Sequence, residues 1–202
     1  MVRKYGFWLA VGALLGWVVM MGLASLRPYQ LRGSVIDSSA PAPEIVLAAT
    51  DGSTYSLHER QGRVALIFFG YTSCPDVCPA TLSEMREVRK ALGERAADVD
   101  MLFITVDPAR DSLERMGMYV SLFDPAILGL TGSPEALEAV YRAYGVTVEF
   151  QTETTAAGYL VTHSSRVYVV DRAGKLRLTY PFGTAVDDIV EDVRYLLKEK
   201  SS

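Results

Sequence analysis

The sequence is poor in cysteine and has no excess of basic residues, and each shortage excludes a class of protein. Two cysteines in 202 residues are too few for a small domain built on a disulfide framework. Basic residues number 20 against 24 acidic ones, and four of the 20 lie before residue 43, so the rest of the chain is acidic and has no basic stripe. Because affinity for phosphates comes from clustered Lys and Arg, we expect no nucleic-acid partner.

Internal repeats and low-complexity sequence are also lacking. Half of the residues are hydrophobic and 22% are charged, against 16 Gly and 9 Pro, which excludes a disordered or collagenous chain. The length fits one domain of ordinary size, or two only if both are small.

An uncharged apolar segment lies near the N-terminus. Residues 7–26 contain no charge and as a helix would cover about 30 Å, the hydrocarbon thickness of a bilayer. Flanking basic residues slightly favour a cytoplasmic N-terminus. The segment starts too close to Met1 for an organelle transit sequence, which favours a bacterial protein. We expect residues 1–27 to anchor the chain as a single pass in the cytoplasmic membrane, with the body on the periplasmic face. A cleaved signal peptide is the alternative, since Gly22 and Ala24 offer small residues for cleavage.

Residues 28–43 predict a tether, because small and polar residues with two Ala-Pro steps favour extended backbone. The body then covers residues 44–202. Its unbroken apolar runs at 64–69 and 101–106 suit strands covered on both faces, and helical periodicity lies between them. Other predicted elements are hairpins at 44–57 and 166–180, a strand at 127–130, and helices at 112–123, at 134–144 and after a Thr184–Asp187 capping box. This order indicates one α/β domain, a sheet between helices.

Both cysteines lie in one turn, directly after the first apolar strand. Pro79 disfavours helical angles at Cys78, so we expect the helix to begin at Pro79 with Cys78 at its cap. The positive end of that helix favours thiolates at Cys74 and Cys78, which can bind a metal or exchange with a disulfide. Inert buried cysteines and a permanent disulfide are the alternatives. The loop that such a disulfide would close is too short to add much stability.

The chain has two histidines. His58 lies in a polar stretch and is interpreted as a solvated loop residue. His163 is either a hydrogen-bonded structural residue or a ligand. With two thiolates it would complete a two-sulfur, one-nitrogen site that suits Cu(I) first and zinc second. Met116 and Met118 are interpreted as helix packing rather than as thioether ligands.

Four segments follow one another in an informative order. They are Cys74-Pro-Asp-Val-Cys78-Pro79, Val106-Asp107-Pro108-Ala-Arg110-Asp111, Gly129-Leu-Thr-Gly132 and Tyr159-Leu-Val-Thr-His163-Ser164. Together they resemble the Sco (SenC) family of copper-handling proteins, which take part in assembling cytochrome c oxidase. The resemblance runs from about residue 42 to residue 197. It implies a thioredoxin-like fold with a mixed central sheet flanked by helices. It also implies that Cys74, Cys78 and His163 bind copper, as Cu(I) first and Cu(II) as a further state.

The chain departs from the family pattern next to the histidine. Family members usually carry Asp there, where this chain has Thr162, and the loss of that acceptor can shift copper affinity. Asp107 and Arg110 either orient the site or a partner, or form an ion pair and turn at the end of a strand.

The resemblance implies a membrane-anchored copper chaperone that delivers copper to the copper A centre of cytochrome c oxidase. Its partners would be the oxidase subunit that carries this centre and other copper chaperones or thiol reductants. Such a chaperone is not an enzyme. The alternative is an enzyme, a thiol–disulfide oxidoreductase that keeps the copper-ligand cysteines of the oxidase reduced and needs Cys74 and Cys78 but not His163. A peroxidase is disfavoured because both cysteines lie in one turn, and a sensor because the chain has no distinct effector segment.

Overall fold

The computed structural model describes residues 12, 14–17, 20, 29–36, 40–155 and 158–199. The chain divides into two compact units, Met1–Gln30 and Leu31–Ser202. In the first unit, residues 12, 14–17 and 20 are helical. A search of the described residues finds no helix with the length and apolar character needed to cross a membrane. Most of the expected membrane segment, residues 7–26, lies outside the described residues.

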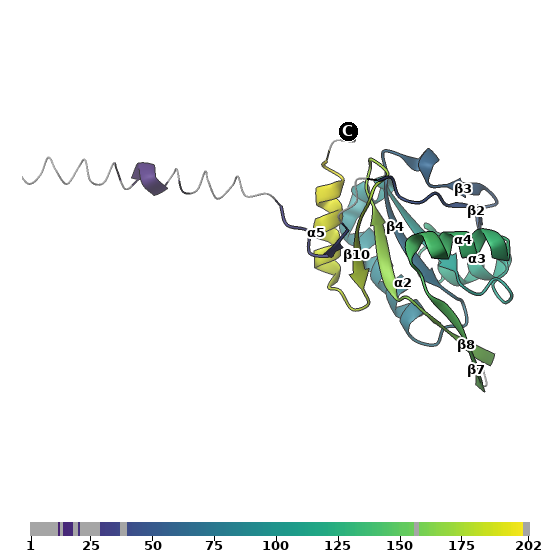
Figure 1. The fold of residues 1–202 in the computed structure, drawn as a ribbon. Helices are drawn as coiled ribbons and strands as arrows, with labels where there is room; N and C mark the ends of the chain where they lie inside the picture. Colours follow the sequence, from purple (N-terminus) through teal and green to yellow (C-terminus); the bar gives the residue numbers. More distant parts are fainter. Residues whose placement is uncertain are drawn as a thin grey trace, which may run out of the picture. The chain divides into compact units, whose positions relative to one another are not determined.

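An eight-stranded sheet forms the centre of the second unit (Figure 1). Its strands lie in the order β1 (Ser34–Val35), β10 (Leu176–Pro181), β9 (Arg166–Val170), β4 (Val64–Gly70), β5 (Val99–Thr105), β6 (Ile127–Thr131), β2 (Val46–Ala49) and β3 (Thr54–Ser56). The β4–β5 and β5–β6 pairs are parallel and the other pairs are antiparallel. Every residue of β4 and β5 is buried, as the two apolar runs predict. The predicted mixed sheet is confirmed.

Helices cover both faces of this sheet. The four that follow Leu31 are α2 (Val77–Leu92), α3 (Leu113–Ser121), α4 (Pro134–Tyr144) and α5 (Val186–Leu196). The ring of Tyr119 on α3 packs on Phe103 of β5, and α2 packs against α5. Phe68 lies beside Phe103 in the sheet, so its neighbour Phe69 points to the other face, where it meets Tyr141 of α4. In Figure 1, α4 lies in front of the sheet and α2 behind it.

A second sheet of two strands is absent from the sequence prediction. β7 (Val148–Thr155) pairs antiparallel with β8 (Gly158–His163) to form a hairpin, which extends past one end of the main sheet in Figure 1. The alternation of Val148 and Phe150 with polar residues was the available signal.

Two predicted helix starts differ from the structure. α2 begins at Val77 rather than at Pro79. A helix can start before Pro79 because the N–H groups of the first turn have no helical acceptor, so the missing N–H group of the proline costs no hydrogen bond there. At α5 the N-cap is Ala185 and no side chain caps the helix. The Thr184 hydroxyl instead donates to the carbonyl of Pro181, 2.7 Å away, so the predicted capping box does not form.

Part of the stretch expected to be a tether belongs to the sheet. Ser34 and Val35 form β1 and pair with β10. The preceding N–H groups of Arg32 and Gly33 donate to Oδ2 of the buried Asp192, at 2.9 and 3.1 Å. These backbone groups find acceptors within the fold instead of in water, so ordered structure begins before residue 44.

Candidate metal centre

The two cysteines lie where β4 turns into α2. The Cys74 N–H group donates to the Tyr71 carbonyl at 3.2 Å and closes the turn. Cys78 follows in the first turn of α2, and its N–H group donates to the sulfur of Cys74 at 3.4 Å. That sulfur therefore accepts from one of the N–H groups that a helix start leaves unsatisfied. Both thiols are free; Cys74 is partly buried and Cys78 fully buried.

The two thiols differ in acidity. A hydrogen bond from Cys78 lowers the pKa of Cys74 to about 4, and His163 and backbone N–H groups support the shift. The same hydrogen bond, together with burial, raises the pKa of Cys78. Near neutral pH the pair therefore holds one proton, with Cys74 as the thiolate and Cys78 as the thiol that donates to it.

Side chains from the segment after β5 hold the cysteine turn. The buried carboxylate of Asp111 accepts from the N–H group of Thr72 at 3.1 Å and from its hydroxyl at 2.5 Å. It also accepts from the hydroxyl of Thr105 at 2.7 Å. Arg115 donates to Thr72 Oγ1 at 2.7 Å and to Ser73 Oγ at 2.9 Å. The backbone that leads to Cys74 is thus fixed before any ligand binds.

A glycine at the end of β4 makes room for the inner sulfur. A Cβ atom on Gly70 would lie 2.9 Å from the sulfur of Cys78 and 2.7 Å from the ring of Phe103. Contacts this short are not tolerated between real side chains, so this position requires glycine.

His163 ends β8 and reaches the cysteine turn from the hairpin. Its Nε2 lies 3.7 Å from the sulfur of Cys78. Its ring meets Phe68 and Tyr71 edge-on, with centroid distances of 6.1 and 6.0 Å. Nδ1 lies 3.3 Å from the Ser164 carbonyl oxygen. In the tautomer that donates there, the lone pair of Nε2 is available to a metal.

The spacing between His163 and Cys78 suits a shared ion. Metal–sulfur and metal–nitrogen bonds of about 2.3 and 2.0 Å, at tetrahedral to trigonal angles, place the two ligand atoms about 3.5–3.8 Å apart. Within the described residues, no group of three or more His, Cys, Asp or Glu side chains is arranged to hold a metal ion. Cys74 lies in the turn before α2, and its sulfur is within hydrogen-bond reach of Cys78.

Asp107 and Arg110 form a second cluster beside the site. Asp107 is fully buried and is ion-paired with Arg110. The guanidinium carbon of Arg110 lies 3.7 Å from the ring centroid of Tyr159 on β8. Sequence reasoning missed Tyr159 and Tyr71. The signal for Tyr159 was its position four residues before His163, on the same side of a strand.

Other residues singled out from the sequence lie in different settings. His58 is half-exposed and contacts Glu44, with 2.6 Å between Nδ1 and Oε2. Met116 is buried in α3, whereas Met118 is 61% exposed. Thr162 is exposed and accepts a hydrogen bond from the Gln151 amide at 2.8 Å. A groove of about 480 Å³ runs between the cysteine turn and the Thr162 side of β8, so Cys74 can be reached from solvent.

Comparison with known proteins identifies the family. The profile of the SCO1/SenC family matches residues 37–198. The chain belongs to the SCO1/SenC family. A protein of Stutzerimonas stutzeri is 37% identical over 136 residues, which cover 67% of this SCO1/SenC chain and 66% of that protein. An SCO2-like protein of Rickettsia felis is 30% identical over 189 residues, 91% of this chain and 92% of the relative.

Solved SCO1/SenC structures have the same fold. ScoI of Bradyrhizobium japonicum, solved with copper bound, superposes with a TM-score of 0.72 and 33% identity, covering 78% of this chain and 99% of that one. The SCO1/SenC body thus has the thioredoxin-like α/β architecture that the sequence motifs imply.

Proposed function

We propose that this SCO1/SenC protein is a copper chaperone that binds one copper ion through Cys74, Cys78 and His163 and delivers it to the copper A centre of cytochrome c oxidase. The observation that carries the proposal is the 3.7 Å approach of His163 Nε2 to the sulfur of Cys78, a spacing that one ion can bridge. The copper-bound state of the related Bradyrhizobium protein supports copper as the cargo. The family is linked to the assembly of cytochrome c oxidase.

The chemistry of the ligand set favours Cu(I) as the cargo, with Cu(II) as a second state. Soft thiolates select Cu(I), and a neutral imidazole completes a three-ligand set. Cys78 must lose its proton when copper binds, so binding releases a proton to solvent. A three-ligand site leaves room for a ligand from an acceptor, and the groove beside Cys74 gives that ligand access. Exchange of ligands then moves the ion without releasing it to water.

We place the protein at the cytoplasmic membrane of a bacterium. In this proposal residues 1–27 cross the membrane once with a cytoplasmic N-terminus, residues 28–43 lead out of it and contribute β1 to the sheet, and residues 44–202 lie with β1 on the periplasmic face. A common membrane raises the effective concentration of the body near a membrane-bound oxidase. The proposed partners are the oxidase subunit with the copper A site, and copper chaperones or thiol reductants that load or recharge Cys74 and Cys78.

X-ray absorption spectroscopy on the full-length chain tests this assignment. We expect a Cu(I) titration of the reduced chain to saturate at one ion, with two sulfur neighbours and one nitrogen neighbour. Loss of the nitrogen neighbour in His163→Ala would assign it to this ring. A copper site with sulfur neighbours alone in the unaltered chain would contradict the proposed ligand set.

A thiol–disulfide oxidoreductase is the second candidate, and the unequal acidity of the thiols favours it. The Cys74 thiolate would attack a partner disulfide, forming a mixed disulfide and releasing one partner thiolate. Cys78 would then lose its proton and attack the sulfur of Cys74. The partner leaves with both of its cysteines reduced, and the two electrons that it gained came from Cys74 and Cys78, which now form a disulfide. A thiol reductant has to recharge the pair.

Genetic complementation separates the two candidates. In a strain deficient in oxidase assembly, the chaperone requires His163 whereas the reductase does not. Full rescue by His163→Ala would favour the reductase, and failure of rescue together with normal protein levels would favour the chaperone.

A further inference from the structure

The hairpin that carries His163 lies outside the main sheet. Among the described strands, β7 and β8 pair only with each other. Because side chains alternate along a strand, Tyr159, Val161 and His163 share one side of β8. The contacts that Tyr159 and Val161 make with the rest of the protein therefore decide where the imidazole lies.

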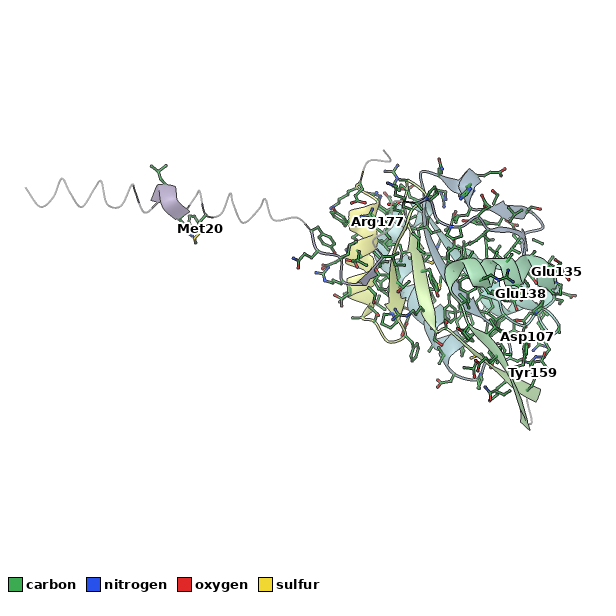
Figure 2. All side chains as sticks on the ribbon, in the orientation of Figure 1. Met20, Asp107, Glu135, Glu138, Tyr159 and Arg177 are labelled. Atoms are coloured by element: carbon green, nitrogen blue, oxygen red, sulfur yellow. The ribbon has the colours of Figure 1, made fainter. Side chains whose placement is uncertain are left out.

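Tyr159 is held by two charged residues of one turn. Its hydroxyl donates to Oδ1 of the buried Asp107 at 2.7 Å, and its ring lies under the guanidinium of Arg110, 3.7 Å from centroid to carbon. Figure 2 shows Asp107 and Tyr159 next to each other where the hairpin leaves the body. Arg110 is itself paired with the Asp107 carboxylate. The three side chains therefore form one connected unit.

The same turn reaches the segment that carries the cysteines. We call residues 107–111 the clamp turn; the N–H groups of Arg110 and Asp111 both donate to the Asp107 carbonyl and close it. The Arg110 guanidinium lies 5.6 Å from the ring centroid of Tyr71, three residues before Cys74. Asp111 holds Thr72.

A direct contact also joins the two arms of the site, which are the segment from Tyr71 to Cys78 (the cysteine arm) and strand β8 with His163 (the histidine arm). The Tyr71 hydroxyl accepts from the N–H group of Val161 on β8 at 3.3 Å. Arg110 thus lies over Tyr159 of the histidine arm and also approaches Tyr71 of the cysteine arm. A shift of the clamp turn would move both arms at once.

We propose that Arg110, with Asp107 and Tyr159, is a positioning device that fixes the distance between His163 and the two sulfurs and so sets copper affinity. The inference rests on the proposed copper site. Arg110 acts through Tyr159 and the β8 backbone and does not bind the cargo. Because the ion pair is buried, loss of one partner also costs stability, and the test has to separate that cost from the change in geometry.

Graded variants of the full-length, reduced chain test the proposal. Tyr159→Phe removes only the hydroxyl bond to Asp107, and we expect about tenfold weaker Cu(I) binding in competition with a chromophoric chelator. Tyr159→Leu and Arg110→Gln also remove the stacking, and we expect about a hundredfold loss. The double variant, Tyr159→Leu with Arg110→Gln, should lose no more Cu(I) affinity than the single variant that binds more weakly, because the two side chains act as one unit. Arg142→Gln is the matched control, since Arg142 pairs with Glu138 on an exposed face of α4.

A readout without copper keeps the inference separate from the proposed function. In NMR spectra of the metal-free chain, Tyr159→Leu and Arg110→Gln should weaken the contacts between the His163 and Tyr71 rings. Tm should stay close to that of the control in Tyr159→Leu but should fall in Arg110→Gln, which leaves the buried Asp107 carboxylate without its cation. Unchanged ring contacts, or copper affinity that falls only in proportion to Tm in every variant, would overturn the inference. If the ring contacts weaken but copper binding never required His163, the positioning role stands and the copper site fails.

Discussion

His163 and Cys78 are 85 positions apart in the sequence, yet the imidazole Nε2 and the thiol sulfur approach to 3.7 Å. The sulfur is fixed by the first turn of α2, and the imidazole by a hairpin at the edge of the fold. The pair is therefore formed by two separate arms, and the site depends on how those arms are held.

Removing the imidazole should affect copper binding more than stability. We expect His163→Ala to weaken Cu(I) binding by at least a hundredfold, because a ligand is lost, while Tm changes little for a partly buried side chain. His58→Ala is the control, since His58 is held by Glu44 and lies outside the proposed ligand set. Competition titrations measure the Cu(I) affinity of both variants. If His163→Ala binds Cu(I) as tightly as His58→Ala, His163 is not a ligand.

Cys74 should react as a thiolate far below the range of an ordinary thiol. The hydrogen bond from Cys78 lowers the pKa of Cys74 to about 4, so its alkylation rate should stay constant between about pH 5 and 8. The alkylation rate of a free thiol with a pKa of about 8.5 would instead rise about tenfold for each pH unit in this range. Mass spectrometry after short iodoacetamide pulses measures the rate at each cysteine.

The same experiment has an internal control. In Cys78→Ala the main cause of the shift is gone, so the pKa of Cys74 should rise and its alkylation rate should depend on pH. A flat profile in this variant would show that another group, and not Cys78, keeps Cys74 ionised.

Gly70→Ala should lower stability and displace the Cys78 sulfur, because the new methyl group would clash with it in the core. The new methyl group would meet the Cys78 sulfur at 2.9 Å and the Phe103 ring at 2.7 Å, in a core without room for either to move. We expect a loss of about 1–3 kcal/mol in the free energy of unfolding, and weaker copper binding because the sulfur is displaced. Urea denaturation and chelator competition measure the two effects.

Gly117→Ala is the matched control, because the nearest side-chain atom to its new methyl group lies 3.6 Å away and the residue is within α3. There the change should be neutral or stabilising by up to about 1 kcal/mol. Similar destabilisation at both positions would refute the packing explanation.

Asp100 should make stability depend on pH. It is buried in β5, and burial raises its pKa, but hydrogen bonds from Arg60 and Arg63 more than offset this, so the pKa lies below the ordinary value. A carboxylate with a lowered folded-state pKa adds stability that is complete above its unfolded pKa of about 3.9 and is lost as pH falls through the folded value. We expect Asp100→Asn to cost about 1–3 kcal/mol at pH 7 and clearly less at pH 3.

Asp98→Asn provides the comparison for Asp100, since Asp98 forms an exposed pair with Arg95 at 3.5 Å. It should change stability by no more than about 0.5 kcal/mol at either pH. Urea denaturation at both pH values measures the difference. A pH-independent loss in Asp100→Asn would mean that the carboxylate contributes through packing rather than charge.

Local patterns were enough for most of the secondary structure. The apolar runs that became β4 and β5, and the Ser133 cap of α4, are properties of neighbouring residues, so the sequence shows them directly. The start of α2 was predicted two residues too late, and a capping box was predicted at Thr184 that does not form. Each depends on which of several nearby groups a hydrogen-bonding group pairs with, and the sequence does not show that choice. The β7–β8 hairpin was missed because its alternation is short and its residues are mostly polar.

The sequence alone determined which residues can supply thiolate and imidazole ligands, since only two cysteines and two histidines exist and the four motif segments indicate which of them to consider. Only the tertiary structure decided their relation. It placed His163 on a separate hairpin beside Cys78, gave the two thiols opposite pKa shifts and put Arg110 next to both arms. These properties depend on distances between segments far apart in the chain, which come from the packing of the whole core and not from any local sequence pattern.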